Sequence, residues 1–71
     1  DPKSTLQELI QEKLEITPTY EIISEEGPDH DKEFEAGVYF DEKLIAKGKG
    51  SSKQKAESEA AENALKDKSW Q

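Results

Sequence analysis

Residues 33–40 alternate between apolar and polar or small side chains, and this alternation constrains the fold more than any other feature. The apolar positions are Phe34, Ala36, Val38 and Phe40. The positions between them are Glu33, Glu35, Gly37 and Tyr39. A repeat of two residues is the period of a β-strand, so one face of this segment should be buried. The segment therefore predicts a sheet with a core on one side.

Two further strands flank this segment. Residues 20–25 are rich in β-branched and aromatic side chains and end at Gly27 and Pro28, so 27–32 should form a polar loop. Asp41 and Glu42 suit a tight turn, after which residues 43–49 should form a third strand. In that strand we expect Leu44 and Ala46 to alternate against Ile45 and Lys47. Short connections of this kind favour an antiparallel meander.

A helix is predicted at each end of the meander. Residues 4–16 carry one apolar stripe, which Pro18 should end. That stripe consists of Leu6, Leu9, Ile10 and Leu14. Two start signals compete, Asp1 before Pro2 and the capping-box spacing of Ser4 with Gln7. Ser51 or Ser52 should cap a second helix that runs to about Lys66.

The second helix carries small residues suited to close packing on a sheet. They are Ala56, Ala60 and Ala64, with Ala61 and Leu65 in an adjacent row. The predicted class is α+β, in the order α-β-β-β-α, with a three-stranded antiparallel sheet and two helices packed on one face. We expect a domain at residues 1–67 and a tail at 68–71, from which Trp70 can fold back onto the body.

The composition limits the function. The chain has 71 residues and a net charge of −7, without arginine or cysteine. A domain of this size has room for one thin core. The lack of cysteine favours a reducing, cytoplasmic location, and no apolar run approaches the roughly 20 residues of a membrane span. A start at Asp1 rather than Met suggests an excised segment or a processed product.

Half of the ten lysines lie in one stretch of an otherwise acidic chain. No acid lies between Glu42 and Glu57, whereas Lys53 and Lys55 fall in the first turn of the second predicted helix. A helix N-terminus already carries roughly +0.5 of partial charge, so acids are the residues favoured there. Lysines at that position, together with free N–H groups, predict a phosphate site. A solvated charged helix end is the alternative interpretation.

Two other polar groups are candidate contacts. The exposed face of the first helix carries Ser4, Gln7, Glu8 and Gln11, whose donors and acceptors suit 2′-hydroxyls and base edges in a shallow groove. An ordinary solvent-facing helix surface is the alternative interpretation, because Gln and Glu are good helix formers. His30 in the 27–32 loop has no catalytic partner in the sequence. Gly48 to Lys53 does not match the glycine spacing of a Walker A loop. No catalytic set or carboxylate metal site is visible, so a free-standing enzyme is disfavoured.

Three motifs resemble a known family. Residues 1–8 (DPKSTLQE) are similar to the opening of the double-stranded RNA-binding domain at the C-terminus of bacterial ribonuclease III. Residues 27–30 (GPDH) resemble its first strand-connecting loop. Residues 48–57 (GKGSSKQKAE), followed by Ala60 and Ala61, resemble its third motif and second helix. The three motifs occur in the same order as in the family. The resemblance covers nearly the whole chain.

The resemblance implies a role for each matching residue. Ser4, Gln7, Glu8 and Gln11 would enter one minor groove, and Pro28 and His30 the next. Ser52, Lys53, Gln54 and Lys55 would hold phosphates across the intervening major groove. Such domains span roughly 16 base pairs and recognise shape more than sequence. This chain differs from many members at Gln54, where they have a second lysine. The rest of the chain is also more acidic than is typical of the family.

The resemblance also implies a cellular context. The segment would bind RNA without cutting it and would need no cofactor. Cleavage would belong to a separate, Mg²⁺-dependent nuclease domain of the same parent chain. The segment itself is expected to be a monomer, and the parent a homodimer that processes RNA, ribosomal RNA included. The rival hypothesis is a protein-interaction or dimerisation module on the same fold, which the charge of −7 favours.

Overall fold

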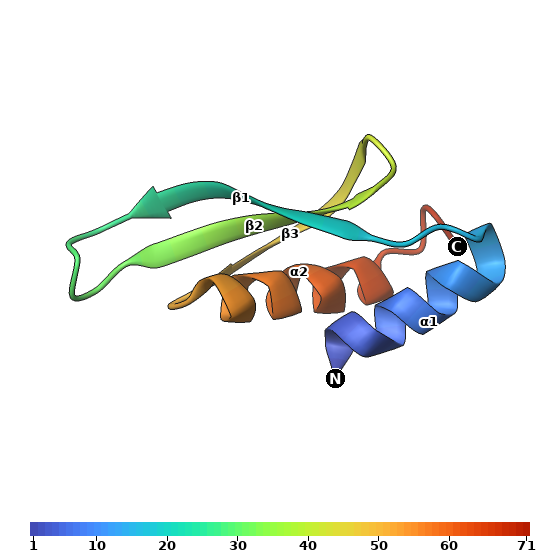
Figure 1. Cartoon of the computed structure of the whole chain (residues 1–71), viewed down its shortest axis with the longest axis horizontal. Helices are drawn as coiled ribbons and strands as arrows, with labels where there is room; N and C mark the ends of the chain where they lie inside the picture. Colours follow the sequence, from blue (N-terminus) through green and yellow to red (C-terminus); the bar gives the residue numbers. More distant parts are fainter.

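The computed structural model describes all 71 residues and has the predicted order of elements (Figure 1). These are α1 (Pro2–Leu14), β1 (Thr19–Glu26), β2 (Glu33–Phe40), β3 (Lys43–Gly50) and α2 (Lys53–Lys66). The strands form one antiparallel sheet in the order β1-β2-β3. The predicted α-β-β-β-α class is therefore confirmed. Neither helix has both the length and the apolar character needed to cross a membrane.

The core lies between the sheet and the helices. Leu6 and Ile10 of α1 are fully buried with Val38 of β2. Ala60, Ala61 and Ala64 of α2 complete the centre of this cluster together with Phe40. In Figure 1, α2 runs beneath the strands, and α1 lies beside α2 at one end of the molecule. The opposite face of the sheet has no helix over it.

Two bulges alter the strand alternation that the sequence predicts. Register shifts occur between Ile22 and Ser24 in β1, and between Val38 and Tyr39 of β2 where they pair with β3. In β3, Ala46 pairs with Val38 and Leu44 pairs with Tyr39, so Ile45 is the extra residue. The expected sharing of one face by Leu44 and Ala46 is wrong, because an extra residue reverses the side-chain alternation. Leu44 is 40% exposed, whereas Ile45 and Ala46 pack on the core.

The two start signals of α1 are resolved in favour of Asp1. The Asp1 carboxylate accepts hydrogen bonds from the N–H groups of Lys3 (2.9 Å) and Ser4 (3.2 Å), with Pro2 at the first helical position. The helix ends at Leu14, where Glu15 adopts a left-handed conformation with φ of 58°. Leu14, which the predicted stripe includes, is 44% exposed because the chain turns away from the core there.

The start of α2 lies close to the end of β3, and two glycines allow this approach. A Cβ atom at Gly48 would collide with the backbone of Ala56 and Ala60. At Gly50 it would lie 2.7 Å from the backbone nitrogen of Ala56. Ser52 caps the helix, since its Oγ accepts a hydrogen bond from the Lys55 N–H (3.1 Å). Gly48 and Gly50 thus allow α2 to pack closely against the sheet.

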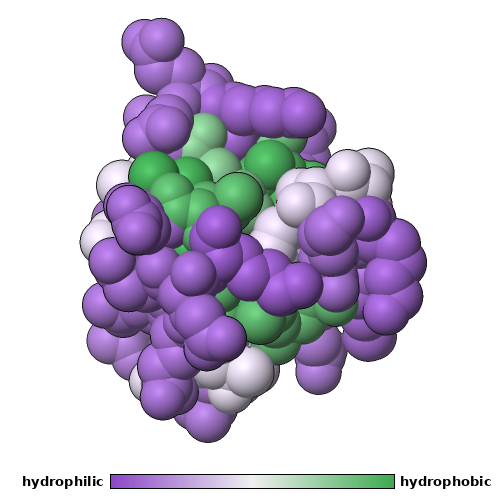
Figure 2. All heavy atoms as spheres, turned by 90° about the vertical axis from the view of Figure 1, so that its right-hand side faces the viewer, coloured by the Kyte–Doolittle hydropathy of each residue, from purple (hydrophilic) through white to green (hydrophobic).

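The last residues fold back onto the domain. The Trp70 indole N–H donates to the Ala64 carbonyl at 2.8 Å, and its ring meets Phe40 edge-to-face at 5.0 Å. Figure 2 views the end of the molecule at which the C-terminus lies, and it shows apolar atoms gathered between hydrophilic groups. Trp70 therefore extends the core beyond the second helix.

Candidate nucleic-acid interface

The polar face of α1 is exposed over its whole length. Ser4, Gln7, Glu8 and Gln11 are all exposed, at a spacing that places them on one side of the helix. The Ser4 hydroxyl donates to Asp1 Oδ2 at 3.0 Å, so it is held in place while its lone pairs stay available. The other three side chains form no hydrogen bond within the chain. This face is a row of donors and acceptors open to a ligand.

The loop between β1 and β2 presents Pro28 and His30 at its exposed tip. Gly27 begins the loop with φ of 98°, a conformation that residues with a Cβ rarely adopt. The Asp31 N–H donates to the Pro28 carbonyl at 2.9 Å and closes a turn. Lys32 forms ion pairs with Glu25 (3.4 Å) and Asp29 (3.8 Å) at the base of the loop. The tip is therefore shaped by its backbone and contains no paired charge apart from Asp29.

The first turn of α2 carries an exposed group of cations and contains no acid. Lys53, Gln54 and Lys55 are exposed, and Ser52 is half-buried because its hydroxyl caps the helix. Lys55 Nζ lies 3.3 Å from Ser51 Oγ, and neither Lys53 nor Lys55 forms an ion pair. Their charges add to the positive end of the helix. Residues 52–55 are therefore the candidate phosphate clamp.

The three groups lie in a row along the length of the molecule. Figure 1 shows the β1–β2 loop at one end, the start of α2 in the middle and α1 towards the other end. The longest dimension of the chain is 40 Å. A hollow of about 470 Å³ joins the last two groups, since it is lined by Ser4 and Gln7 of α1 and by Gln54 of α2. The fold thus brings together two of the three predicted contact regions.

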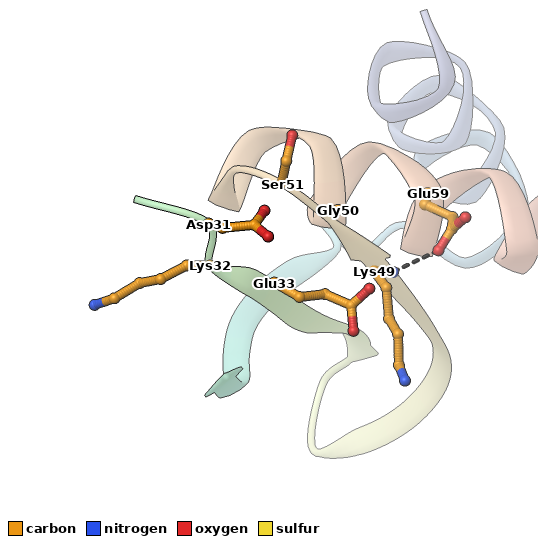
Figure 3. Close-up of a pocket in the computed structure, with 7 residues that line it drawn as sticks. All are labelled: Asp31, Lys32, Glu33, Lys49, Gly50, Ser51 and Glu59. Atoms are coloured by element: carbon orange, nitrogen blue, oxygen red, sulfur yellow. Dashed lines mark hydrogen bonds between the residues drawn. The ribbon is translucent and has the colours of Figure 1, made fainter. Parts of the chain in front are cut away.

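A second hollow lies between the base of the β1–β2 loop and α2 (Figure 3). Its volume is about 450 Å³, and none of the predicted contact residues lines it. Carboxylates of Asp31, Glu33 and Glu59 surround it, and Glu59 accepts a hydrogen bond from the backbone N–H of Lys49. Lys32 and Lys49 also line this hollow, so its three acids outnumber its two cations and disfavour a nucleic-acid backbone. The chain contains no group of three or more side chains arranged to hold a metal ion.

A charged cluster beside the first hollow is not predicted by any local pattern in the sequence. Lys3 of α1 forms an ion pair with Glu57 of α2 at 2.6 Å, and its ammonium lies 5.0 Å from the centre of the Tyr20 ring. Burial, with a further contribution from Glu57, raises the pKa of Tyr20 to about 12. Lys3 and Ser58 also line the hollow. The opposite charges are visible in the sequence, but their 54-residue separation conceals the contact.

These features define a small module with three separate, exposed polar segments. Residues 2–68 match the family model of the double-stranded RNA binding motif, and the chain belongs to that family. It is a double-stranded RNA-binding domain, as its motifs and fold predict. The assignment of individual contact residues stays a prediction.

The chain is similar to one part of several longer proteins. The chain is 55% identical to Ribonuclease 3 from Carboxydothermus hydrogenoformans over 65 residues, which cover 92% of this chain and 28% of the relative. It is 54% identical to Ribonuclease 3 from Borreliella afzelii over 93% of this chain and 27% of the relative. A solved structure of Dicer from Pichia stipitis matches 97% of this chain and 33% of its own, with a TM-score of 0.77 and 25% identity. The chain therefore spans just over a quarter of its curated relatives.

Proposed function

We propose that this chain contacts one side of an RNA duplex through three groups of residues. The face of α1, with Ser4, Gln7, Glu8 and Gln11, enters one minor groove. Pro28 and His30 enter the next minor groove, and the phosphate clamp holds the backbone between them. The observation that carries this proposal is the placement of the unpaired Lys53 and Lys55 at the start of α2, between the other two groups. Recognition is by shape, with 2′-hydroxyls distinguishing RNA from DNA.

The parent protein that fits best is an endoribonuclease of the ribonuclease III type. High identity to two Ribonuclease 3 sequences supports this, since the chain aligns with about a quarter of each. In such a protein, the domain would position RNA for a Mg²⁺-dependent nuclease domain elsewhere in the chain. The whole protein would act as a cytoplasmic homodimer in RNA processing, whereas the isolated domain would be monomeric.

A salt titration tests the binding proposal. For a ligand that neutralises Z phosphates, log K falls with log salt at a slope of about −0.9Z in B-DNA, and a similar dependence is expected here. With few free lysines on the path, we expect Z of about 2–4 for a 20-base-pair RNA duplex. A DNA duplex of the same sequence should bind more weakly, because it lacks 2′-hydroxyls. No binding at low salt would contradict the proposal.

The alternative function is protein interaction through the same fold. Its support is the net charge of −7 and the face of the sheet without a helix, where Ile23 and Leu44 are each 40% exposed. This alternative would be favoured if the chain does not bind RNA but forms a concentration-dependent dimer in sedimentation experiments.

A further inference from the structure

One ion pair links the two helices. Lys3 Nζ lies 2.6 Å from Glu57 Oε1, and the side chains of the two residues are only 35% and 22% exposed. The same ammonium lies over the ring of Tyr20 in β1, which adds a cation–π contact. The other ion pairs of the chain all involve Lys32, at the β1–β2 loop. Lys3 and Glu57 therefore form the only charged connection between α1 and α2.

This connection lies between two of the proposed RNA contacts. Lys3 precedes Gln7 by one turn of α1, and Glu57 follows Lys53 by one turn of α2. Lys3 also lines the hollow that Ser4, Gln7 and Gln54 share. A change in the pair would thus alter the spacing between the face of α1 and the phosphate clamp.

A fixed spacing between the α1 face and the phosphate clamp should strengthen binding to an RNA duplex. Recognition by shape requires the minor-groove and phosphate contacts to be made together, and any freedom between the helices must be lost on binding. A partly buried ion pair is screened less by salt than an exposed one, so it can hold the helices under ordinary conditions. The pair also offsets the charge of Glu57, a carboxylate one turn away from the clamp.

We propose that Lys3 and Glu57 are positioning residues that hold the α1 face and the phosphate clamp at the spacing an RNA duplex requires. Neither residue needs to touch RNA for this role. The inference rests on the proposed function, since it concerns the geometry of the same interface. Binding of the unaltered chain to the 20-base-pair duplex tests that function separately.

Glu57→Gln gives the decisive comparison, because two explanations predict changes of opposite sign. Removing an acid makes the domain less negative, so charge alone would strengthen RNA binding. The positioning role predicts weaker binding, by roughly three- to tenfold. Glu62→Gln is the matched control, since Glu62 is an exposed acid on the same helix and forms no ion pair. Its affinity should equal or exceed that of the unaltered chain.

A charge swap separates positioning from direct contact. Lys3→Glu combined with Glu57→Lys keeps the net charge and can rebuild the pair in reverse. Positioning predicts recovery to within about threefold of the unaltered affinity, whereas Lys3→Glu alone should bind much more weakly. A double variant that binds no better than Lys3→Glu would overturn the proposal and assign Lys3 to a phosphate contact.

Folding is measured beside binding, by thermal unfolding of every variant, and affinities are compared well below the lowest midpoint. If Glu57→Gln unfolds too readily for this comparison, the charge swap alone decides. Equal affinity of folded Glu57→Gln and Glu62→Gln would also overturn the proposal. Failure of the unaltered chain to bind the duplex would instead contradict the proposed function.

Discussion

At the scale of single residues, the same side-chain type has different roles at different places. Lys53 is exposed and unpaired at the start of α2, whereas Lys3 is half-buried and paired with Glu57. We propose that the first contacts a phosphate, whereas the second connects two helices. The position of Lys53 in the first turn of a helix is evident from the sequence. The pairing of Lys3 is not, because it depends on how α1 packs against α2.

Replacing Lys53 tests the phosphate clamp. Lys53→Ala should weaken RNA binding to a similar extent across duplex sequences and reduce the salt slope by about 1. Lys66→Ala is a suitable control, since Lys66 is exposed at the opposite end of α2. A salt slope that is the same in Lys53→Ala and the unaltered chain would place the phosphate contact elsewhere.

The hydroxyl of Tyr20 should make the stability of the domain sensitive to alkaline pH. It is buried without a hydrogen-bond partner, and burial, with Glu57, raises its pKa to about 12 from 10.0. The folded state holds this proton more tightly than the unfolded state does. The resulting contribution of Tyr20 to the free energy of unfolding is fully present below pH 10 and is lost as the pH rises towards 12.

Tyr20→Phe provides the matched comparison. It removes an unpaired buried oxygen and keeps the ring beneath Lys3, so stability at pH 7 should be unchanged or greater by about 1 kcal/mol. Urea unfolding between pH 9 and 12 should show a smaller loss for this variant than for the unaltered chain. Equal losses would assign the pH dependence to other groups.

At the scale of elements, local sequence signals located every helix and strand, but not their detailed register. The alternation at 33–40 correctly indicates which face of β2 is buried. The bulges at Ile23 and Ile45 have no comparable signal, because they depend on how neighbouring strands twist and pair. Leu14 continues the stripe of α1 in the sequence, but Glu15 ends the helix before Leu14 reaches the core.

Gly48 should be the most sensitive glycine in the sheet. Gly48→Ala places a Cβ against the backbone of Ala56 and Ala60, which cannot move without displacing α2. We expect a loss of about 2–3 kcal/mol in the free energy of unfolding, measured by urea denaturation. Gly37→Ala is the control, since its Cβ would meet the flexible ends of Leu44 (2.8 Å) and Ile23 (2.9 Å). Similar losses at both positions would argue against close packing of α2 on β3.

At the scale of the whole molecule, an acidic chain places two exposed, unpaired lysines, Lys53 and Lys55, at the start of α2. Net charge alone argues against a nucleic-acid ligand, but the distribution separates a lysine-bearing helix start from acidic surfaces elsewhere. The family, the fold and the three motifs were all predictable from sequence. The joining of Ser4, Gln7 and Gln54 in one hollow was not, because it requires the packing of α1 on α2.

The central claim is that one face of the molecule contacts RNA at three places together. Amide chemical shifts of the labelled chain, recorded by NMR during addition of the 20-base-pair RNA duplex, test this most directly. We predict simultaneous changes at residues 4–11, 28–30 and 52–55, with little change around Ile23 and Leu44 on the uncovered face of the sheet. Changes confined to one of these segments, or centred on the uncovered face, would contradict the account.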